Sequence, residues 1–357
     1  MTLNEIGEFG FIQKISRGCL IRPDNVIKSI GDDAAAFTVE PDRVSLITTD
    51  LLVERIHFIR NSISGFDLGY KSLAVNLSDI AAMGGKAREA FISIAIPQDC
   101  PLEYLEAFYD GLKNLAARFD VNILGGDTTN SKDDLIINIV VQGTVDQTQM
   151  MCRNAARPGD IIVSSGYLGD SKAGLHLILN NIPTDTEDLQ ALYRAHVLPE
   201  PHLHEGRFLA SQPGTHAGID TSDGLSSDLG HIAEESQVGA TLYFDNIPIS
   251  ESLLKFCSRF DFDPVEYALS GGEDYTLLCT LAPQNAADIA AKFQAEFKRP
   301  LFRIGEINDK NRLDMTYPDG SSKPIAPTGW NHFKNEKPIT DDPEAPPFTQ
   351  DDKIQDE

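Results

Sequence analysis

The chain has 357 residues, of which 41% are hydrophobic and 24% are charged. This length exceeds what one small core needs and predicts two or three domains. The formal net charge of −24 and the pI near 4.6 argue against nucleic-acid binding, because such affinity depends on a basic surface. No apolar run approaches the roughly 18 residues of a membrane span, and the first residues lack the pattern of a signal peptide. We therefore expect a cytoplasmic protein that contacts neither nucleic acid nor membrane.

Short β-rich runs alternate with helical patterns along the chain, which is typical of a mixed α/β fold. Strands are predicted at 43–50, 89–97, 135–145, 160–166, 240–245, 274–281 and 301–307. Helices are predicted at 68–83, where apolar residues recur at helical spacing before Gly84-Gly85, and at 102–119, 172–179, 226–235 and 286–297.

A polar stretch at 152–160, containing Pro158-Gly159, predicts a domain boundary near residue 150. We expect an N-terminal domain over residues 1–150 and a C-terminal domain over residues 151–334. Residues 335–357 hold eight acidic side chains against two lysines, and they cannot bury enough apolar surface to offset their ordering entropy. We expect this segment to be a disordered, solubilising tail.

Carboxylates recur beside glycines and at the ends of predicted elements. An isolated buried carboxylate is strongly unfavourable, and several close together raise one another's pKa, so divalent cations would stabilise them. The groups are GDDAA with Asp32 and Asp33, TTD with Thr48, Thr49 and Asp50, NLSD with Asp79, GGDTT with Asp127, and IDTSDG with Asp220, Ser222 and Asp223. One such group alone is more typical of turn capping. Several in one chain favour a metal site.

The oxygen-only composition of these groups favours magnesium. Ser and Thr hydroxyls lie among the acids and no His or Cys does, which suits magnesium rather than zinc or copper. Asp220 and Asp223 are three residues apart, so a turn directs both the same way. The helix predicted after them begins with free N–H groups that favour anions. This segment therefore predicts a site for metal and phosphate.

Motifs of other nucleotide and metal sites are missing. The sequence has neither a Gly-x-x-x-x-Gly-Lys-Ser/Thr loop nor a Gly-x-Gly-x-x-Gly run, and it lacks the His-Arg-Asp and Asp-Phe-Gly signatures of protein kinases. The five cysteines are scattered without a Cys-x-x-Cys pair, which argues against a disulfide framework and a zinc site. A phosphoryl-transfer enzyme with this sequence is of neither the P-loop nor the protein-kinase type.

A series of motifs follows along the chain: GDDAA, TTDLLVERIHF, YKSLAVNLSDIAAMGG, LGGDTT, DTSDGLSSDLGHIAE and LSGGEDYTL. In this order and spacing they closely resemble the thiamine-monophosphate kinase family. That family belongs to the superfamily of aminoimidazole ribonucleotide synthetase, selenophosphate synthetase and the hydrogenase maturation dehydratase. The resemblance runs from about Glu8 to Phe333. It implies a two-domain α/β fold of the aminoimidazole ribonucleotide synthetase-like type with mixed sheets, and a homodimer.

The activity that the resemblance implies is in-line transfer of the γ-phosphoryl group of ATP to thiamine monophosphate, giving thiamine diphosphate and ADP. The acceptor is a phosphate oxygen that is already ionised near neutral pH, so no strong general base is needed and no catalytic side chain is expected. Several magnesium ions would neutralise the two sets of phosphates instead. ATP would lie near the N-terminal domains, and the C-terminal domain would close the site.

The resemblance also implies ligand roles at matching positions. The magnesium ligands would be Asp33, Thr48, Thr49, Asp50, Asp79, Asp127, Asp220 and Asp223, with Asp127 and Asp223 the most essential. The ATP contacts would be Tyr109, Gly126, Asp127, Arg153 and Ser222. The contacts to thiamine monophosphate would be His57, Glu273 and Trp330, with Asp274 a structural residue.

Alternatives stay open at this stage. His57 alone is more typical of a satisfied, partly buried histidine, and Trp330 is also a candidate packing anchor. Another ATP-using synthetase of the superfamily is one alternative function, although the cysteines that two of its members need are missing from the expected places. A non-catalytic nucleotide-binding protein is the other, and the retained carboxylates argue against it.

Overall fold

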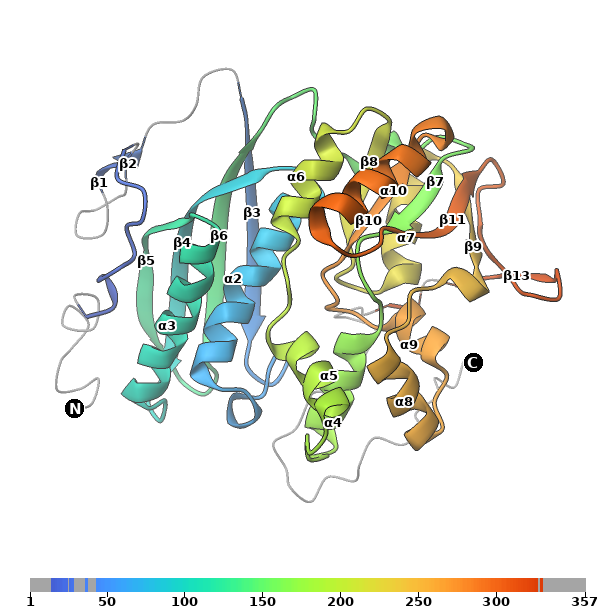
Figure 1. Ribbon diagram of the computed structural model, residues 1–357. Coiled ribbons are helices and arrows are strands. Elements are labelled where there is room, and N and C mark those ends of the chain that lie inside the picture. The colour runs from blue at the N-terminus through green and yellow to red at the C-terminus, as the bar shows by residue number, and fades with distance from the viewer. Residues whose placement is uncertain (1–13, 25, 29–35, 38–42, 327, 330–357) are drawn as a thin grey trace.

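A computed structural model describes residues 14–24, 26–28, 36–37, 43–326 and 328–329. Within them the chain forms a four-stranded sheet, a seven-stranded sheet and a short antiparallel pair, β1 (Val26–Lys28) with β2 (Ala36–Phe37). Helices lie between the two large sheets and, in the view of Figure 1, below the second one. No helix among the described residues is long and apolar enough to cross a membrane.

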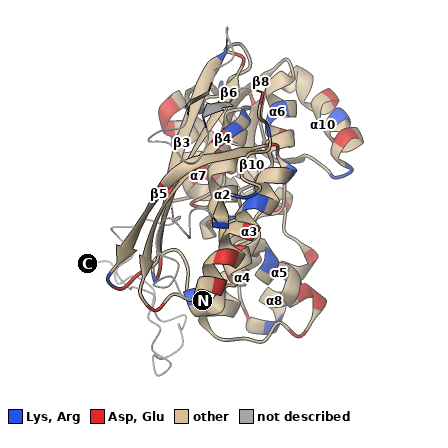
Figure 2. Ribbon diagram, turned by 90° about the vertical axis from the view of Figure 1, so that its left-hand side faces the viewer, with Lys and Arg blue, Asp and Glu red and all other residues tan. Residues whose placement is uncertain are grey.

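The four-stranded sheet comprises β3 (Val44–Val53), β4 (Lys86–Pro97), β5 (Asn122–Ser131) and β6 (Ile136–Val145). Its order is β3-β6-β4-β5, with the β4–β5 pair parallel and the other pairs antiparallel. Helices α2 (Gly65–Ala82) and α3 (Leu102–Arg118) lie on one side of this sheet (Figure 2). Along β3 the side chains alternate, with Leu46 and Leu52 buried beneath α2 and Ile47 and Leu51 exposed on the opposite side.

The seven-stranded sheet has the order β13-β12-β9-β11-β7-β10-β8 and is antiparallel except for the β12–β9 pair. Its strands are β7 (Ile161–Ser164), β8 (Thr215–Asp220), β9 (Gly239–Tyr243), β10 (Leu277–Leu281), β11 (Phe302–Asn308), β12 (Leu313–Thr316) and β13 (Ser322–Pro324). The accompanying helices are α4 (Asp170–Leu179), α5 (Glu187–Val197), α6 (Leu203–Ser211), α7 (Leu225–Ser236), α8 (Glu251–Phe260), α9 (Pro264–Ser270) and α10 (Pro283–Phe297).

Helix α2 is the central element of the fold, and its sequence defines both of its ends. The Ser64 hydroxyl accepts a hydrogen bond from the Asp67 N–H at 3.0 Å, which is an N-cap. At the other end the N–H of Gly85 donates to the Ile80 carbonyl and the N–H of Gly84 to the Ala81 carbonyl, which is a Schellman motif. The predicted stop at Gly84-Gly85 is therefore confirmed.

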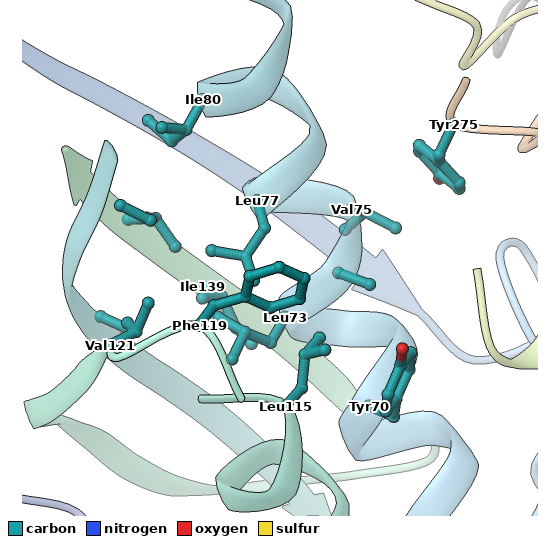
Figure 3. Packing of buried hydrophobic residues seen from close by; sticks show 14 of the residues in the cluster. Tyr70, Leu73, Val75, Leu77, Ile80, Leu115, Phe119, Val121, Ile139 and Tyr275 are labelled. Carbon is teal, nitrogen blue, oxygen red and sulfur yellow. The ribbon is translucent and has the colours of Figure 1, made fainter. Parts of the chain in front are cut away.

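The core around α2 joins the two sheets. Leu73 and Leu77 of α2 pack with Leu115 and Phe119 of the α3 region and with Ile139 of β6 (Figure 3). Tyr275, just before β10, belongs to the same buried cluster. Because α2 is buried on nearly every side, burial of its apolar side chains stabilises both halves of the molecule at once.

The predicted strands and helices are all present, with ends that shift by a few residues. Four helices, α5, α6, α8 and α9, and four strands of the large sheets, β5, β8, β12 and β13, were not predicted. The predicted tail at 335–357 lies outside the described residues.

Candidate active site

Three of the predicted carboxylates lie close together where α2 passes between the two sheets. They are Asp50 on β3, Asp79 in the last turn of α2, and Asp220 at the end of β8. We call these three residues the acidic cluster. Asp50 is on the α2 side of β3 because it shares the alternation of the buried Leu46 and Leu52. Asp220 is only 2% exposed.

Short polar contacts orient the acidic cluster. The Thr48 hydroxyl donates to Oδ2 of Asp79, and the Ser78 hydroxyl donates to Oδ2 of Asp220 at 2.6 Å. The backbone N–H of Asp50 donates to Oδ1 of Asn76 on α2 at 3.1 Å. Hydroxyl groups therefore orient the carboxylates of Asp79 and Asp220 without neutralising them, and Asn76 fixes the backbone of Asp50.

The carboxylates of the acidic cluster repel one another and are largely removed from water, and both effects raise their pKa values. Burial and then the Asp79 charge raise the pKa of Asp50 to about 7. Burial and then Asp79 likewise raise the pKa of Asp220 to about 7. The pKa of Asp79 is also raised, chiefly by burial, against the opposing effects of Thr48 and Arg153. A bound cation would favour the ionised forms of all three.

The donor chemistry of the cluster fits magnesium only if other ligands complete the shell. Among the described residues, no group of three or more His, Cys, Asp or Glu side chains is arranged to hold a metal ion by itself. Magnesium keeps several waters and is usually bound through one or two carboxylates together with substrate phosphates. Carboxylates with adjacent hydroxyls, such as Asp79 with Thr48, are donors of that kind.

The segment after β8 places further polar groups beside the cluster. Ser222 and Asp223 lie in the turn before α7, and the Gly224 N–H at the start of that helix donates to Oδ2 of Asp228 at 2.9 Å. Arg153 belongs to a 3-10 turn at Arg153–Ala155, and its side chain is 46% exposed. Its positive charge lowers the pKa of both Asp79 and Asp220 against the larger effect of burial, so it lies within electrostatic reach of the cluster.

The predicted residues on β5 lie apart from the cluster. Asp50 of β3, Ile139 of β6, Ile92 of β4 and Gly126 of β5 are in register across the sheet, so Asp50 and Gly126 are on opposite edges. Three strand spacings separate them, about 14 Å. Asp127, next to Gly126, is exposed. The structure thus does not bring Asp127 to the acidic cluster within one chain.

Gly126 is required by the geometry of β5. Its φ is +154°, and a Cβ there would lie 1.6 Å from the backbone oxygen of Ile92. A side chain at this position would push β5 away from β4 and displace Asp127.

Two further predicted ligands occupy other surroundings. Thr49 is on the face of β3 opposite the cluster, where its hydroxyl accepts from Nδ2 of Asn138 at 2.8 Å. Tyr109 is 4% exposed in the core of α3, where its ring meets Phe108 edge-on. Asp33 and Trp330 lie outside the described residues.

His57 lies in a turn that follows β3. Its Nδ1 accepts a hydrogen bond from the Val53 N–H at 3.0 Å, so Nε2 carries the proton of the neutral ring. The positive form of His57 is one of the charges that lower the pKa of Glu273. The structure therefore brings His57 and Glu273, 216 positions apart in the sequence (273 − 57), into the same region.

Glu273 lies between α9 and β10 with φ at +63°, a left-handed conformation that costs a non-glycine residue about 1 kcal/mol or more. Its N–H donates to the Ser222 carbonyl at 2.8 Å, so the two predicted ligand segments are joined through the backbone. The adjacent Asp274 accepts from the N–H groups of Gly169 and Ser171 at the start of α4. This is the structural role that the sequence predicted for it.

Sequence reasoning missed Lys71, which is 1% exposed and contacts Glu273. Lys71 lies in the apolar helix α2, and a single lysine in a helix is usually expected to point into solvent. A signal was available, because an 18-residue helix with apolar or small residues on nearly every side leaves no face for a solvated lysine.

Both parts of the chain match known proteins in sequence. The N-terminal domain model of the AIR synthase related proteins matches residues 31–145, and their C-terminal domain model matches residues 157–318. The thiamine-monophosphate kinase of Haemophilus influenzae is 37% identical over 338 residues, covering 93% of this chain and 99% of that protein. The Bacillus subtilis thiamine-monophosphate kinase is 34% identical over 330 residues, covering 92% of this chain and 99% of that protein.

Solved structures show the same fold. The thiamine-monophosphate kinase from Stenotrophomonas maltophilia K279a superposes with a TM-score of 0.79 at 34% identity, covering 89% of this chain and 98% of that one. AaThiL complexed with AMPPCP and TMP superposes with a TM-score of 0.74 at 31% identity, covering 93% of this chain and 99% of that one. HypE from E. coli shares the fold alone, with a TM-score of 0.76 at 18% identity, covering 93% of this chain and 100% of that one.

Proposed function

Since the chain belongs to the thiamine-monophosphate kinase family, within the AIR synthase related proteins, we propose that it transfers the γ-phosphoryl group of ATP to thiamine monophosphate. The products are thiamine diphosphate and ADP. The observation that carries this proposal is the acidic cluster, Asp50, Asp79 and Asp220, in a chain that aligns with thiamine-monophosphate kinases over nearly its whole length. A related structure complexed with AMPPCP and TMP supports the pair of substrates.

The proposed division of labour follows the two halves of the chain. Residues 1–150 form the nucleotide and metal domain, and residues 151–334 form the domain that closes the site. Gly126, Asp127, Arg153 and Ser222 contact ATP, whereas Tyr109, also predicted to do so, is buried in the core and is left out of this set. His57, Glu273 and Trp330 contact thiamine monophosphate.

Magnesium is the proposed cofactor. When bound, it neutralises the facing phosphates and orients them for in-line attack. Asp79 and Asp220 are the ligands that the polar contacts of the described residues support best, together with Asp50, Thr48 and the nearby Asp223. Asp33, Thr49 and Asp127 are further proposed ligands.

The side chains of the protein do the rest by position and charge. Arg153 can add a fork of donors to a phosphate oxygen while its charge opposes the repulsion within the cluster. The turn before α7 offers backbone N–H groups at a helix start, which favours an anion there. No described side chain has to remove a proton, because the attacking phosphate oxygen is ionised near neutral pH.

A homodimer is part of the proposal. The face of β3 away from α2 exposes Ile47 at 72% and Leu51 at 53%, which is unusual for two aliphatic side chains on one strand. A second copy covering this face would bury them. Asp127 is in register with Leu51 across the sheet, so it lies on this exposed face, whereas Asp50 faces α2. Asp127 of a second copy could therefore meet Asp50 only around the edge strand β3.

Mixing two inactive variants tests the shared site. If Asp50 and Asp127 act across the interface, co-expressed Asp50→Asn and Asp127→Asn chains form mixed dimers with one intact site, and about a quarter of wild-type activity returns. If both residues act within one chain, no site in the mixture is intact. Light scattering on the same samples reports whether dimers form at all.

Formation of thiamine diphosphate tests the function itself. Purified protein with ATP and magnesium should convert thiamine monophosphate and should leave thiamine unchanged. ATP binding without thiamine diphosphate would favour a non-catalytic nucleotide-binding protein, and ATP consumption with a different acceptor would favour another synthetase of the superfamily. Asp223→Asn should remain folded and lose turnover, and wild-type rates in that variant would remove Asp223 from the metal set.

A further inference from the structure

A buried contact joins three distant segments around the carboxylate of Glu273. Nζ of Lys71, on α2, lies 3.0 Å from Oε2 of Glu273 and 3.3 Å from Nε2 of His196, on α5. Nδ1 of His196 lies 3.3 Å from the same Oε2. The side chains of Lys71 and His196 are 1% and 6% exposed, whereas that of Glu273 is 28% exposed. Lys71 and His196 are therefore buried within the protein, whereas part of the Glu273 side chain is accessible from outside.

The hydrogen-bond inventory of these groups assigns the tautomer of His196. A lysine ammonium can only donate, so Nε2 of His196 accepts from Nζ of Lys71. Nδ1 then carries the ring proton and faces Oε2 of Glu273 and the Ser171 hydroxyl, which is 3.0 Å away. Burial and the Lys71 charge lower the pKa of His196 to about 3, so the ring is neutral. Lys71 thus supplies the positive charge of the contact. His196 is neutral and accepts a hydrogen bond from the Lys71 ammonium.

Hydrogen bonds to the segment 221–222 also fix the backbone around Glu273. Glu273 and Tyr275 both have positive φ, and their N–H groups donate to the carbonyls of Ser222 and Thr221. A Cβ on the preceding Gly272 would lie 2.6 Å from the Ser222 oxygen, so this approach needs glycine. A glycine or asparagine at 273 would fit the left-handed conformation at lower cost. The backbone therefore holds the glutamate at 273 in one defined position.

All the described contacts of the Glu273 carboxylate use one oxygen. Oε2 accepts from Lys71 and faces His196, and 28% of the side chain remains exposed. We infer that Lys71 and His196 are positioning residues that hold Oε2, so that the rest of the carboxylate meets a hydrogen-bond-donating edge of the acceptor substrate. An amino-substituted heteroaromatic ring, such as the aminopyrimidine of thiamine monophosphate, has the donors that fit. This inference rests on the proposed function, because it assigns Glu273 to the acceptor.

The competing interpretation is a purely structural contact between α2 and the C-terminal half. Both interpretations predict a loss of stability when Lys71 is removed, because an uncompensated charge stays buried. They differ in the kinetics. A positioning role raises the KM for thiamine monophosphate and leaves that for ATP nearly unchanged, whereas a structural contact leaves both KM values unchanged in the fraction that is folded.

The test uses Lys71→Met in the full-length protein, with steady-state kinetics for each substrate. The KM for thiamine monophosphate should rise roughly tenfold or more, the effect of losing a charge-assisted hydrogen bond, and the KM for ATP should stay within about twofold. Asp274→Asn is the matched control, because it changes a half-buried carboxylate next to Glu273 whose described hydrogen bonds go to the start of α4. It should lower Tm without changing either KM.

A double-mutant cycle separates action through Glu273 from independent action. If Lys71 acts through Glu273, the variant Lys71→Met/Glu273→Gln should have the same KM for thiamine monophosphate as Glu273→Gln alone. Additive effects would overturn the inference, as would an unchanged KM in Lys71→Met. If Lys71→Met does not fold, His196→Gln provides the same comparison from the other side of the contact.

The wild-type control distinguishes the two possible failures. If the wild type forms no thiamine diphosphate, the proposed function fails and the inference fails with it. If the wild type is active and the KM for thiamine monophosphate does not respond to Lys71→Met or His196→Gln, the inference alone is wrong.

Discussion

The acidic cluster and Glu273 are two partly buried carboxylate sites whose charges the fold compensates in opposite ways. Burial and mutual repulsion raise the pKa of Asp50 and of Asp220 to about 7. Burial also acts to raise the pKa of Glu273, but the charge of Lys71 and its hydrogen bond to the carboxylate lower it, and the net shift is downward. The first site lacks an internal cation and is suited to receive one, whereas the second contains its cation and is suited to a polar ligand.

Helix α2 connects these two sites. It carries Lys71 and Asp79 eight positions apart, about 12 Å along the helix axis. A substrate with a phosphate at one end and a polar ring at the other could therefore reach both sites along one rigid element. The two sites should therefore respond differently to substitution.

The largest effect is expected for Asp79→Asn. Asp79 is a proposed metal ligand, and its charge repels the carboxylates of both Asp50 and Asp220. We expect kcat to fall by about a thousandfold, the order seen when an electrostatic group of an active site is removed. Tm without magnesium should rise, because one of three repelling charges is gone. A fall in Tm together with normal kcat would mean that the cluster is structural.

The second largest effect is expected in the pH dependence of stability, which should differ between Asp50→Asn and the wild type. A carboxylate whose pKa is raised on folding holds its proton more tightly in the folded state, so its contribution to stability is lost as pH rises. For Asp50 the window runs from the ordinary 3.8 to about 7. Denaturant titrations without metal should measure this effect. Between pH 4 and 8 the free energy of unfolding of Asp50→Asn should fall by about 2 kcal/mol less than that of the wild type. This figure is smaller than the full pKa shift implies, because Asp50 and Asp79 titrate together.

Magnesium provides the control for this pH effect. It should reduce the wild-type loss of stability above pH 7 and have little effect on Asp50→Asn. Equal pH profiles for the two proteins would show that Asp50 is not held at a raised pKa.

Glu273→Gln should give a smaller effect and of a different kind. We expect about a tenfold rise in the KM for thiamine monophosphate, with kcat changed less than in Asp79→Asn. Isothermal titration with thiamine monophosphate and a non-hydrolysable ATP analogue would measure the two affinities separately. Equal loss of both affinities would place Glu273 outside the acceptor site.

The smallest effect is expected at the beginning of α2. Ser64→Ala removes the N-cap and should lower the free energy of unfolding by about 1 kcal/mol. Both KM values should stay unchanged, because the cap lies at the end of α2 opposite Asp79. Altered kinetics in this variant would indicate that α2 moves as a unit during turnover.

The sequence predicted the elements whose pattern is strong and local. Helix α2 was found from its apolar spacing and from Gly84-Gly85, because the Schellman motif depends on neighbouring residues only. Strand β5 was missed because Asn122–Ser131 contains two adjacent glycines, and polar residues fill its exposed second half. Its edge position explains that composition, and edge position is a property of the whole sheet.

The candidate site shows the same division. The carboxylates of the acidic cluster were identified from residue type and from their place at element ends. Their separation from Asp127 depends on the strand order β3-β6-β4-β5, which no local pattern encodes. The contact of Lys71 with Glu273 joins positions 202 residues apart and likewise needed the fold.

The central claim is tested most directly by an end-point assay of the purified protein with ATP, magnesium and thiamine monophosphate, run beside a reaction with thiamine as acceptor. The account predicts thiamine diphosphate and an equal amount of ADP from the monophosphate, and no phosphorylated product from thiamine. Bound ATP with no thiamine diphosphate from either reaction would contradict it.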